Sequence, residues 1–123
     1  MMANILSVAV GGALGSVLRY LVGLIPLGAS DGFPYKTLAI NLVGSFLIGL
    51  IAAAASRRPG LDAQLVLLWK VGFCGGFTTF SSFALESVGL IKSGHGLSAL
   101  LYIVLSVTLS VCAIFLAESL AAN

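Results

Sequence analysis

Three polar side chains interrupt long apolar stretches of this 123-residue chain, and each could serve an ion or a ligand. They are the amide of Asn41, the guanidinium of Arg19 and the carboxylate of Glu86. Polar groups are costly to place in hydrocarbon, which makes them candidates for function. Structural alternatives stay open: a hydrogen bond between helices for Asn41, a side chain that reaches the membrane surface for Arg19, and a salt bridge or interfacial carboxylate for Glu86.

Hydroxyl groups form a second set of candidates near the C-terminus. Tyr102, Ser106 and Ser110 follow one another at four-residue intervals, a spacing that places them on one face of a helix. Such a stripe could offer hydrogen bonds along a path through a membrane. Serines in membrane helices also bond the carbonyl of the residue four positions earlier, so a structural role for the stripe is an equal alternative.

The segment GFCGGFTTFSSF, residues 72 to 83, departs from the pattern of an ordinary membrane helix. Its Gly-Gly and Thr-Thr pairs disfavour a continuous helix, so we expect a break that frees backbone carbonyl groups. Irregular backbone within a membrane is tolerated where it is buried or lines a cavity, and interrupted spans often hold ions. Ser81 and Ser82, between Phe80 and Phe83, indicate that this segment faces something polar.

The composition shows that these residues must lie within a membrane. Hydrophobic residues make up 59% of the chain and charged residues 8%, against about 25% charged in a typical soluble domain. Together with a mean hydropathy of +1.15, this excludes a cytosolic enzyme, a disordered tail and a nucleic-acid binder, and it predicts an all-α integral membrane protein. Cys74 and Cys112 lie in apolar stretches, so we expect small buried side chains rather than a disulfide or a metal site.

Four apolar spans must position the candidate residues. A transmembrane helix needs about 20 apolar residues, and cutting the chain at its charged and turn-rich segments gives spans of residues 4 to 25, 35 to 55, 65 to 91 and 97 to 120. The first span lacks a charged leading region and is too long for a signal peptide, so we expect it to be retained. The connecting segments are too short for a soluble domain, which predicts a single transmembrane domain, residues 1 to 123.

Positive charges are balanced between the two sides of the membrane. Four spans place both termini and the 56 to 64 loop on one side, and the 26 to 34 and 92 to 96 loops on the other. The nearby cations are Arg57, Arg58 and Lys70 on the first side, and Arg19, Lys36 and Lys92 on the second. Orientation follows an excess of Lys and Arg on one side, and this count of three against three shows none. We therefore expect insertion in both orientations; the alternative is that one well-placed cation decides.

Segments of the first three spans resemble the CrcB/Fluc family of bacterial fluoride channels. The resemblance is carried by GGALGSVLRY, NLVGSFLIG and GFCGGFTTFSSF, and the order and length of all four spans agree with it. It implies a dual-topology antiparallel homodimer with two pores. It also implies a structural sodium ion at the dimer interface, held by the backbone carbonyls of Gly75 and Thr78 where the third helix is broken near its middle.

The resemblance also implies roles for the candidate residues. The fluoride pore would be lined by Asn41, Phe80, Ser81, Ser82, Phe83, Tyr102, Ser106 and Ser110. Arg19 would match an arginine of the vestibule, and Glu86 a carboxylate near the other end of the pore. Ser82 stands where many members carry threonine, and it keeps the hydroxyl group.

These residue types suit a small, strongly hydrated anion. Such an ion loses a large hydration energy on entering a membrane, so its path must offer hydrogen-bond donors in place of water, and amide and hydroxyl groups do so. A full positive charge along the path would bind the ion too firmly for release. The edges of aromatic rings carry partial positive charge, which gives Phe80 and Phe83 a role that lipid packing does not.

We expect a passive fluoride-selective channel in the bacterial inner membrane, which exports fluoride from the cytoplasm and so confers fluoride resistance. The main alternative is a small proton-coupled multidrug exporter, also built from four spans in a dual-topology dimer, which needs an ionisable residue such as Glu86 deep in the membrane. A third possibility, a noncatalytic assembly subunit, would leave the expected break in the third span unexplained. An enzyme is not expected, because the single histidine, His95, lies in a loop and the sequence shows no pairing of a nucleophile with a base.

Overall fold

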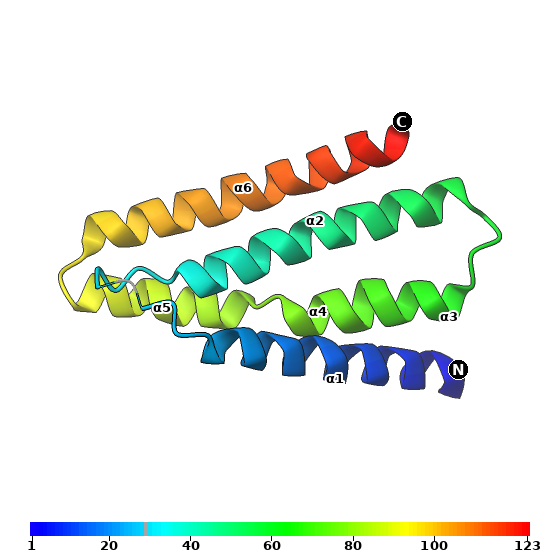
Figure 1. Ribbon diagram of the computed structural model, residues 1–123, viewed down its shortest axis with the longest axis horizontal. Helices are drawn as coiled ribbons and strands as arrows, with labels where there is room; N and C mark the ends of the chain where they lie inside the picture. Colours follow the sequence, from blue (N-terminus) through cyan, green and yellow to red (C-terminus); the bar gives the residue numbers. More distant parts are fainter. Residues whose placement is uncertain (29) are drawn as a thin grey trace.

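The computed structural model describes residues 1–28 and 30–123, and every regular element in them is helical (Figure 1). The elements are α1 (Met2–Leu24), α2 (Tyr35–Arg57), α3 (Ala63–Val66), the π-helix η1 (Leu67–Phe73), α4 (Cys74–Phe77), α5 (Phe80–Lys92) and α6 (Gly96–Ala122). Elements α3 to α5 together form the third long segment, Ala63–Lys92. Four segments are thus long and apolar enough to cross a membrane, and their ends lie within two residues of the predicted spans. The chain is an all-helical, multi-pass membrane protein.

The two ends of the molecule carry different connections. Both termini lie at one end with the α2–α3 connection, and the α1–α2 and α5–α6 connections lie at the other (Figure 1). Before α2, the Asp31 carboxylate accepts hydrogen bonds from the Phe33 backbone N–H at 3.0 Å and from the Tyr35 hydroxyl at 2.8 Å. These bonds, the first of them most, hold the pKa of Asp31 below its usual value. Position 29 of the predicted turn lies outside the described residues.

Helix α1 packs against η1 and α4 through direct backbone contact. A Cβ atom on Gly11 would overlap the Leu68 carbonyl oxygen, and one on Gly15 would overlap the Phe73 carbonyl oxygen. From the other side, a Cβ atom on Gly72 would come within 2.7 Å of the Val8 carbonyl oxygen. Small residues at these positions allow two helices to approach closely, which is a main source of helix association in membranes.

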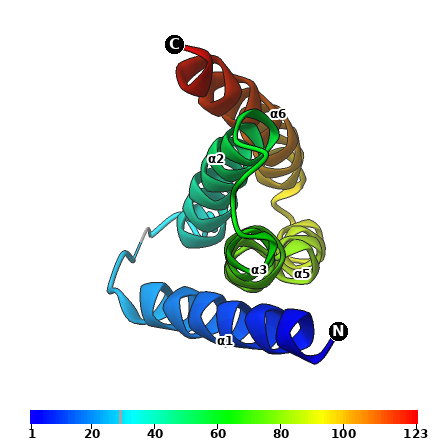
Figure 2. The same cartoon turned by 90° about the vertical axis from the view of Figure 1, so that its right-hand side faces the viewer.

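The helices form an open arrangement rather than a closed bundle. Helix α6 packs along α2 and its first part against α5, while α1 lies beyond the third segment, on the far side from α6 (Figure 2). At Gly49 of α2, a Cβ atom would come within 2.9 Å of the Ala117 Cβ, which shows how closely α2 and α6 approach. Large apolar faces are therefore left to the surroundings, as expected for a chain that lies in a membrane.

The two cysteines have different environments. Cys74 is buried, as predicted, at 1% exposure. The prediction was wrong for Cys112, which is exposed. The reason is that α6 packs mainly against α2 and α5, so its outer face, unlike that of a helix in a closed bundle, is left uncovered by the described part of this chain.

Candidate functional site

Two extended residues separate α4 from α5. Thr78 has φ −76° and ψ 159°, and Thr79 has φ −150° and ψ 119°, so neither continues the helix. We call these two residues the α4–α5 junction. The glycine pair Gly75–Gly76, which the sequence also pointed to, lies inside α4.

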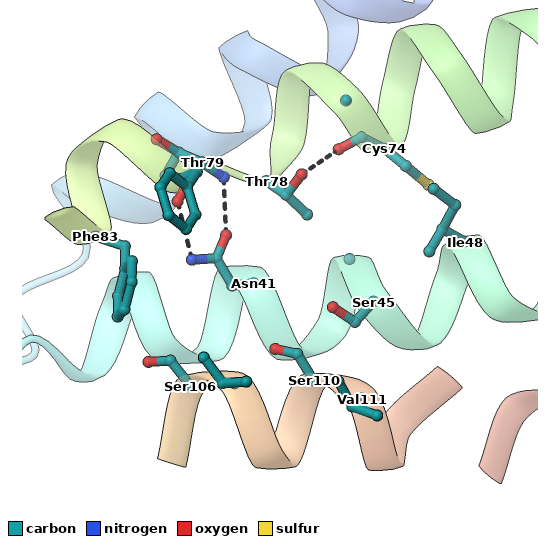
Figure 3. A pocket seen from close by; sticks show the side chains of 14 residues that line it. Asn41, Ser45, Ile48, Cys74, Thr78, Thr79, Phe83, Ser106, Ser110 and Val111 are labelled. Carbon is teal, nitrogen blue, oxygen red and sulfur yellow. Dashed lines mark hydrogen bonds between the residues drawn. The ribbon is translucent and has the colours of Figure 1, made fainter. Parts of the chain in front are cut away.

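Asn41 of α2 binds the backbone of the junction with both of its amide atoms (Figure 3). Its Nδ2 donates to the Thr79 carbonyl at 3.0 Å, and its Oδ1 accepts from the Thr79 backbone N–H at 2.8 Å. Asn41 therefore satisfies backbone groups that a helix would otherwise have paired, which a membrane requires. The hydrogen bond between helices that was expected of Asn41 is present, and its partner is the backbone of the α4–α5 junction.

Thr79 was expected to interrupt the helix as part of the Thr-Thr pair, but it was not predicted as a residue of the site. Its Oγ1 accepts from the Ser82 backbone N–H at 3.2 Å and bonds the Ser82 hydroxyl at 3.0 Å, so it caps the N-terminus of α5. The signal that could have found it is the preference of threonine and serine for the residue that precedes a helix.

The junction interrupts the helical hydrogen-bond pattern at the carbonyl groups that precede α5, among them those of Gly75 and Thr78. The helical donor for Gly75 is the Thr79 N–H, which binds Asn41 instead, and the helical donor for Thr78 is the Ser82 N–H, which binds Thr79 Oγ1. The Thr78 hydroxyl donates to the Cys74 carbonyl at 2.8 Å and so turns back into α4. Carbonyl oxygens of this kind are suitable ligands for a cation.

A cavity of about 380 Å³ lies beside the junction and brings many of the predicted residues together (Figure 3). It is lined by parts of α2, α4, α5 and α6 and by the junction itself. The predicted residues along it are Asn41, Gly75, Thr78, Phe80, Phe83, Ser106 and Ser110. Ser45 of α2, which was not predicted, also lines it, and none of the residues that line this cavity is charged.

Phe80 and Phe83 stand at this cavity with very different exposure. Their ring centres are 5.6 Å apart and their planes are inclined at 52°. Phe83 is 8% exposed and also contacts the Tyr102 ring, with centres 5.1 Å apart, whereas Phe80 is 79% exposed. Phe83 is thus fixed by its neighbours, and Phe80 is held by little else in this chain.

The three residues of the α6 stripe have separate environments. Ser106 is buried at 6% exposure, and its hydroxyl oxygen has no hydrogen-bond partner within the described part of the chain. The structural alternative, a bond to the carbonyl four residues earlier, is therefore wrong for Ser106. Ser110 is half-buried at the same cavity. Tyr102 is fully buried, and its hydroxyl donates to Glu86 Oε2 at 2.6 Å.

Glu86 is held by two hydroxyl groups from neighbouring helices. Besides Tyr102 of α6, Thr37 of α2 donates to its Oε1 at 2.7 Å. Both partners are neutral, so the carboxylate is stabilised by hydrogen bonds and not by the salt bridge considered from the sequence. Thr37 was not predicted, because nothing in its local sequence shows that it faces a residue 49 positions away.

A second cavity, of about 720 Å³, also borders the junction. Arg19, Ser82 and Glu86 line it, and Thr79 lines both cavities. The Arg19 Nε donates to the Gly76 carbonyl at 3.1 Å, so this side chain has a partner within the protein. Within one chain Arg19 and Glu86 border the same cavity, whereas the resemblance implies opposite ends of a pore. Ser81 is exposed and lines neither cavity.

One family model and several named proteins match most of this chain. The family model described as "CrcB-like protein, Camphor Resistance (CrcB)" matches residues 6–118. A protein of Agrobacterium fabrum named "Fluoride-specific ion channel FluC" is 48% identical over 124 residues, which cover 99% of this chain and 98% of the relative. Proteins with the same name from Chlorobaculum tepidum and Leptospira interrogans are each 49% identical, covering 83% and 85% of this chain and 81% and 83% of the relatives.

Proposed function

Because the chain belongs to the CrcB family, we propose that it is a fluoride-selective ion channel, not an enzyme, that lets fluoride leave the cytoplasm passively. The observation that carries this proposal is the uncharged cavity beside the junction, which combines two phenylalanine rings with the unpaired hydroxyl of buried Ser106. The names of the relatives support a channel and give no support to the proton-coupled multidrug exporter. We further propose the inner membrane of a bacterium as its location.

The cavity offers hydrogen-bond donors to a fluoride ion and places no formal positive charge beside it. The ring edges of Phe80 and Phe83 carry partial positive charge, and the Ser106 and Ser110 hydroxyls can donate further along α6. The N-terminus of α5, which begins at Phe80, adds the positive end of a helix dipole. Each of these interactions is weak on its own, which permits the ion to move on.

The second cavity would provide the aqueous entrance. Arg19 and Lys36 supply two positive charges there against the single carboxylate of Glu86, and this excess of positive charge attracts an anion from solution. Since Thr79 borders both cavities, the junction lies between this entrance and the pore.

Efflux from liposomes tests the function. We expect purified protein to release fluoride rapidly and chloride not at all, because the cavity would replace the hydration shell of fluoride with hydroxyl donors and ring edges. Liposomes without protein are the control. Equal release of the two anions, or release only under a proton gradient, would contradict the proposal and favour a transporter.

We propose that the channel is a dual-topology antiparallel homodimer. The cavity beside the junction is open to one side, and Phe80 stands 79% exposed at its edge, so a second copy is needed to enclose a path. The balance of three cations against three permits the two copies to insert in opposite directions. Two chains related by a two-fold axis would form two equivalent pores.

We also propose a structural sodium ion at the interface of this dimer. The Gly75 and Thr78 carbonyls would hold it, since both have lost their helical donors and both residues line the open cavity. Within the described residues no cluster of His, Cys, Asp and Glu side chains could hold a metal, so backbone oxygen is the donor that suits this site. When bound, the ion would link the carbonyls of both chains across an interface that otherwise has only packing contacts.

Removal of sodium should weaken the dimer. We expect exhaustive replacement of sodium by a bulky organic cation to lower both the dimer fraction and the fluoride flux, because carbonyl groups of the two chains would then face one another without a counter-charge. The measurement is size-exclusion chromatography beside liposome efflux, with potassium as a second comparison. A dimer of unchanged stability and full flux in the organic cation would rule out the sodium site.

Replacement of the cavity phenylalanines should slow fluoride and spare the fold. We expect Phe80→Ile to lower flux by about tenfold, since isoleucine is apolar but lacks the positive ring edge. Phe83→Ile should do the same and also lose the contact with Tyr102. The matched control is Phe73→Ile, at a ring that stacks on Phe77 and does not line the cavity. If all three variants conduct alike, the rings at the cavity serve packing only.

A further inference from the structure

Arg19 forms a hydrogen bond with the protein backbone that the attraction of an anion would not require. Its Nε donates to the Gly76 carbonyl at 3.1 Å, across 57 positions of sequence. Gly11, Gly15 and Arg19 recur every four residues, so Arg19 lies on the face of α1 that packs against η1 and α4. The close backbone approach at the two glycines brings the guanidinium group to the end of α4.

The Gly76 carbonyl lies where the helical hydrogen bonds stop. Ala63–Phe77 is helical throughout, and the extended residues Thr78 and Thr79 follow at once. The last carbonyl groups of a helix lack helical donors and carry negative partial charge. Arg19 supplies a donor to one of them, and Asn41 binds the backbone on the other side of the junction.

From this arrangement we propose that Arg19 is a positioning residue, which fixes the C-terminal end of α4 through its Nε–H and does so by hydrogen bonding rather than by its charge. Arg19 binds the Gly76 carbonyl, which lies in the sequence between the Gly75 and Thr78 carbonyls that the proposed sodium ion would use, so fixing this end of α4 would also position those carbonyls. This last consequence rests on the sodium site proposed above; the role of Arg19 in holding α4 does not.

Two substitutions separate the hydrogen bond from the charge. In Arg19→Gln the amide nitrogen is attached to Cδ, as Nε is in arginine, so a donor stays in place while the charge is lost. In Arg19→Lys a carbon atom takes that position and the charge is kept. Lysine provides a point charge without the fixed donor geometry of arginine. Lys36→Gln is the matched control, because it removes another charge from the same cavity, and the Lys36 ammonium group donates to the Gly23 carbonyl of α1 rather than to α4.

Amide hydrogen exchange at Thr78 is the first readout, measured on the full chain in lipid nanodiscs. The Thr78 N–H donates to the Cys74 carbonyl at 3.0 Å and forms the last helical bond of α4, so it reports fraying of this end. We expect exchange in Arg19→Gln and in Lys36→Gln to stay near that of the unmodified protein, and exchange in Arg19→Lys to be about tenfold faster. Equal rates in the Gln and Lys variants at position 19, or a slower rate in the Lys variant, would overturn the proposal.

The unmodified protein provides a measurement that no folding defect can affect. A hydrogen-bonded Arg19 Nε–H should give a resonance protected from exchange with water at neutral pH, whereas a guanidinium free in the cavity exchanges at once. An unprotected Arg19 Nε–H would overturn the proposal even if every variant were unstable.

The sodium response is the third readout, and it distinguishes the two proposals. We expect sodium to raise the thermal unfolding midpoint of the unmodified protein and of Arg19→Gln over the value in a bulky organic cation, and to leave Arg19→Lys unchanged. A sodium response in Arg19→Lys equal to that of Arg19→Gln would show that the Arg19 hydrogen bond does not affect the proposed sodium site. If sodium has no effect on the unmodified protein, the sodium site is wrong, and amide exchange still decides the role of Arg19.

Discussion

Asn41→Asp should abolish fluoride flux, with a loss of about 100-fold or more, although the two side chains have the same shape. The carboxylate has no N–H to donate to the Thr79 carbonyl, and it would place negative charge beside that oxygen in a medium of low dielectric. It would also repel an anion in the cavity that Asn41 lines. Both effects act in the same direction. Efflux from liposomes with equal amounts of inserted protein measures the result.

Ser45→Asp separates the two effects. Ser45 lies one turn further along α2 and lines the same cavity, so its replacement adds the same charge there while the Asn41–Thr79 bonds stay intact. We expect Ser45→Asp to keep several-fold more flux than Asn41→Asp. Equal losses in the two variants would mean that repulsion of the anion explains the whole effect, and that the bonds to Thr79 have no part in conduction.

Forcing all copies into one orientation should remove nearly all activity. Two lysines added beside Arg57 and Arg58 should bias insertion, because the 56 to 64 loop is short enough for its charge to direct topology. The biased chain then lacks the oppositely inserted partner that the proposed dimer requires. The measurement is fluoride efflux from cells, with C-terminal reporter fusions to establish the orientation.

Complementation provides the control for this experiment. A second chain with lysines added near Lys36 should insert the other way and be inactive alone, and co-expression of the two should restore efflux. Two alanines added beside Arg57 and Arg58 control for the insertion itself. A single orientation in the unmodified, active protein would contradict the antiparallel dimer, and with it a sodium ion shared by oppositely oriented chains.

The four helices could be predicted from sequence because hydropathy acts locally. Runs of about 20 apolar residues bounded by charged or turn-forming residues determine where a chain crosses a membrane, whatever its helices pack against. No such local signal predicts the π-helix η1, since its residues, LLWKVGF, are equally compatible with an ordinary α-helix.

The site could be predicted by residue type but not by contact. Composition pointed to an irregular segment around Gly75 and Thr79, yet the exact extended residues are those whose backbone Asn41 can reach from α2. Arg19 and Glu86 were singled out from the sequence as polar groups within predicted membrane spans. Their partners lie 57 and up to 49 positions away in the sequence, on helices whose relative rotation no local pattern specifies.

The glycine contacts between α1 and the third segment have a consequence for motion. Backbone touches backbone at Gly11, Gly15 and Gly72, so no layer of adaptable side chains lies between these helices. Neither helix can slide or rotate against the other without a clash of main-chain atoms, and the pair must move as one rigid body. The cavity beside the junction is lined by α2, α4, α5 and α6 and by no residue of α1, so any motion of its walls would have to come from α2, α5 or α6, or from side chains such as the exposed ring of Phe80, and not from sliding of α1 against the third segment.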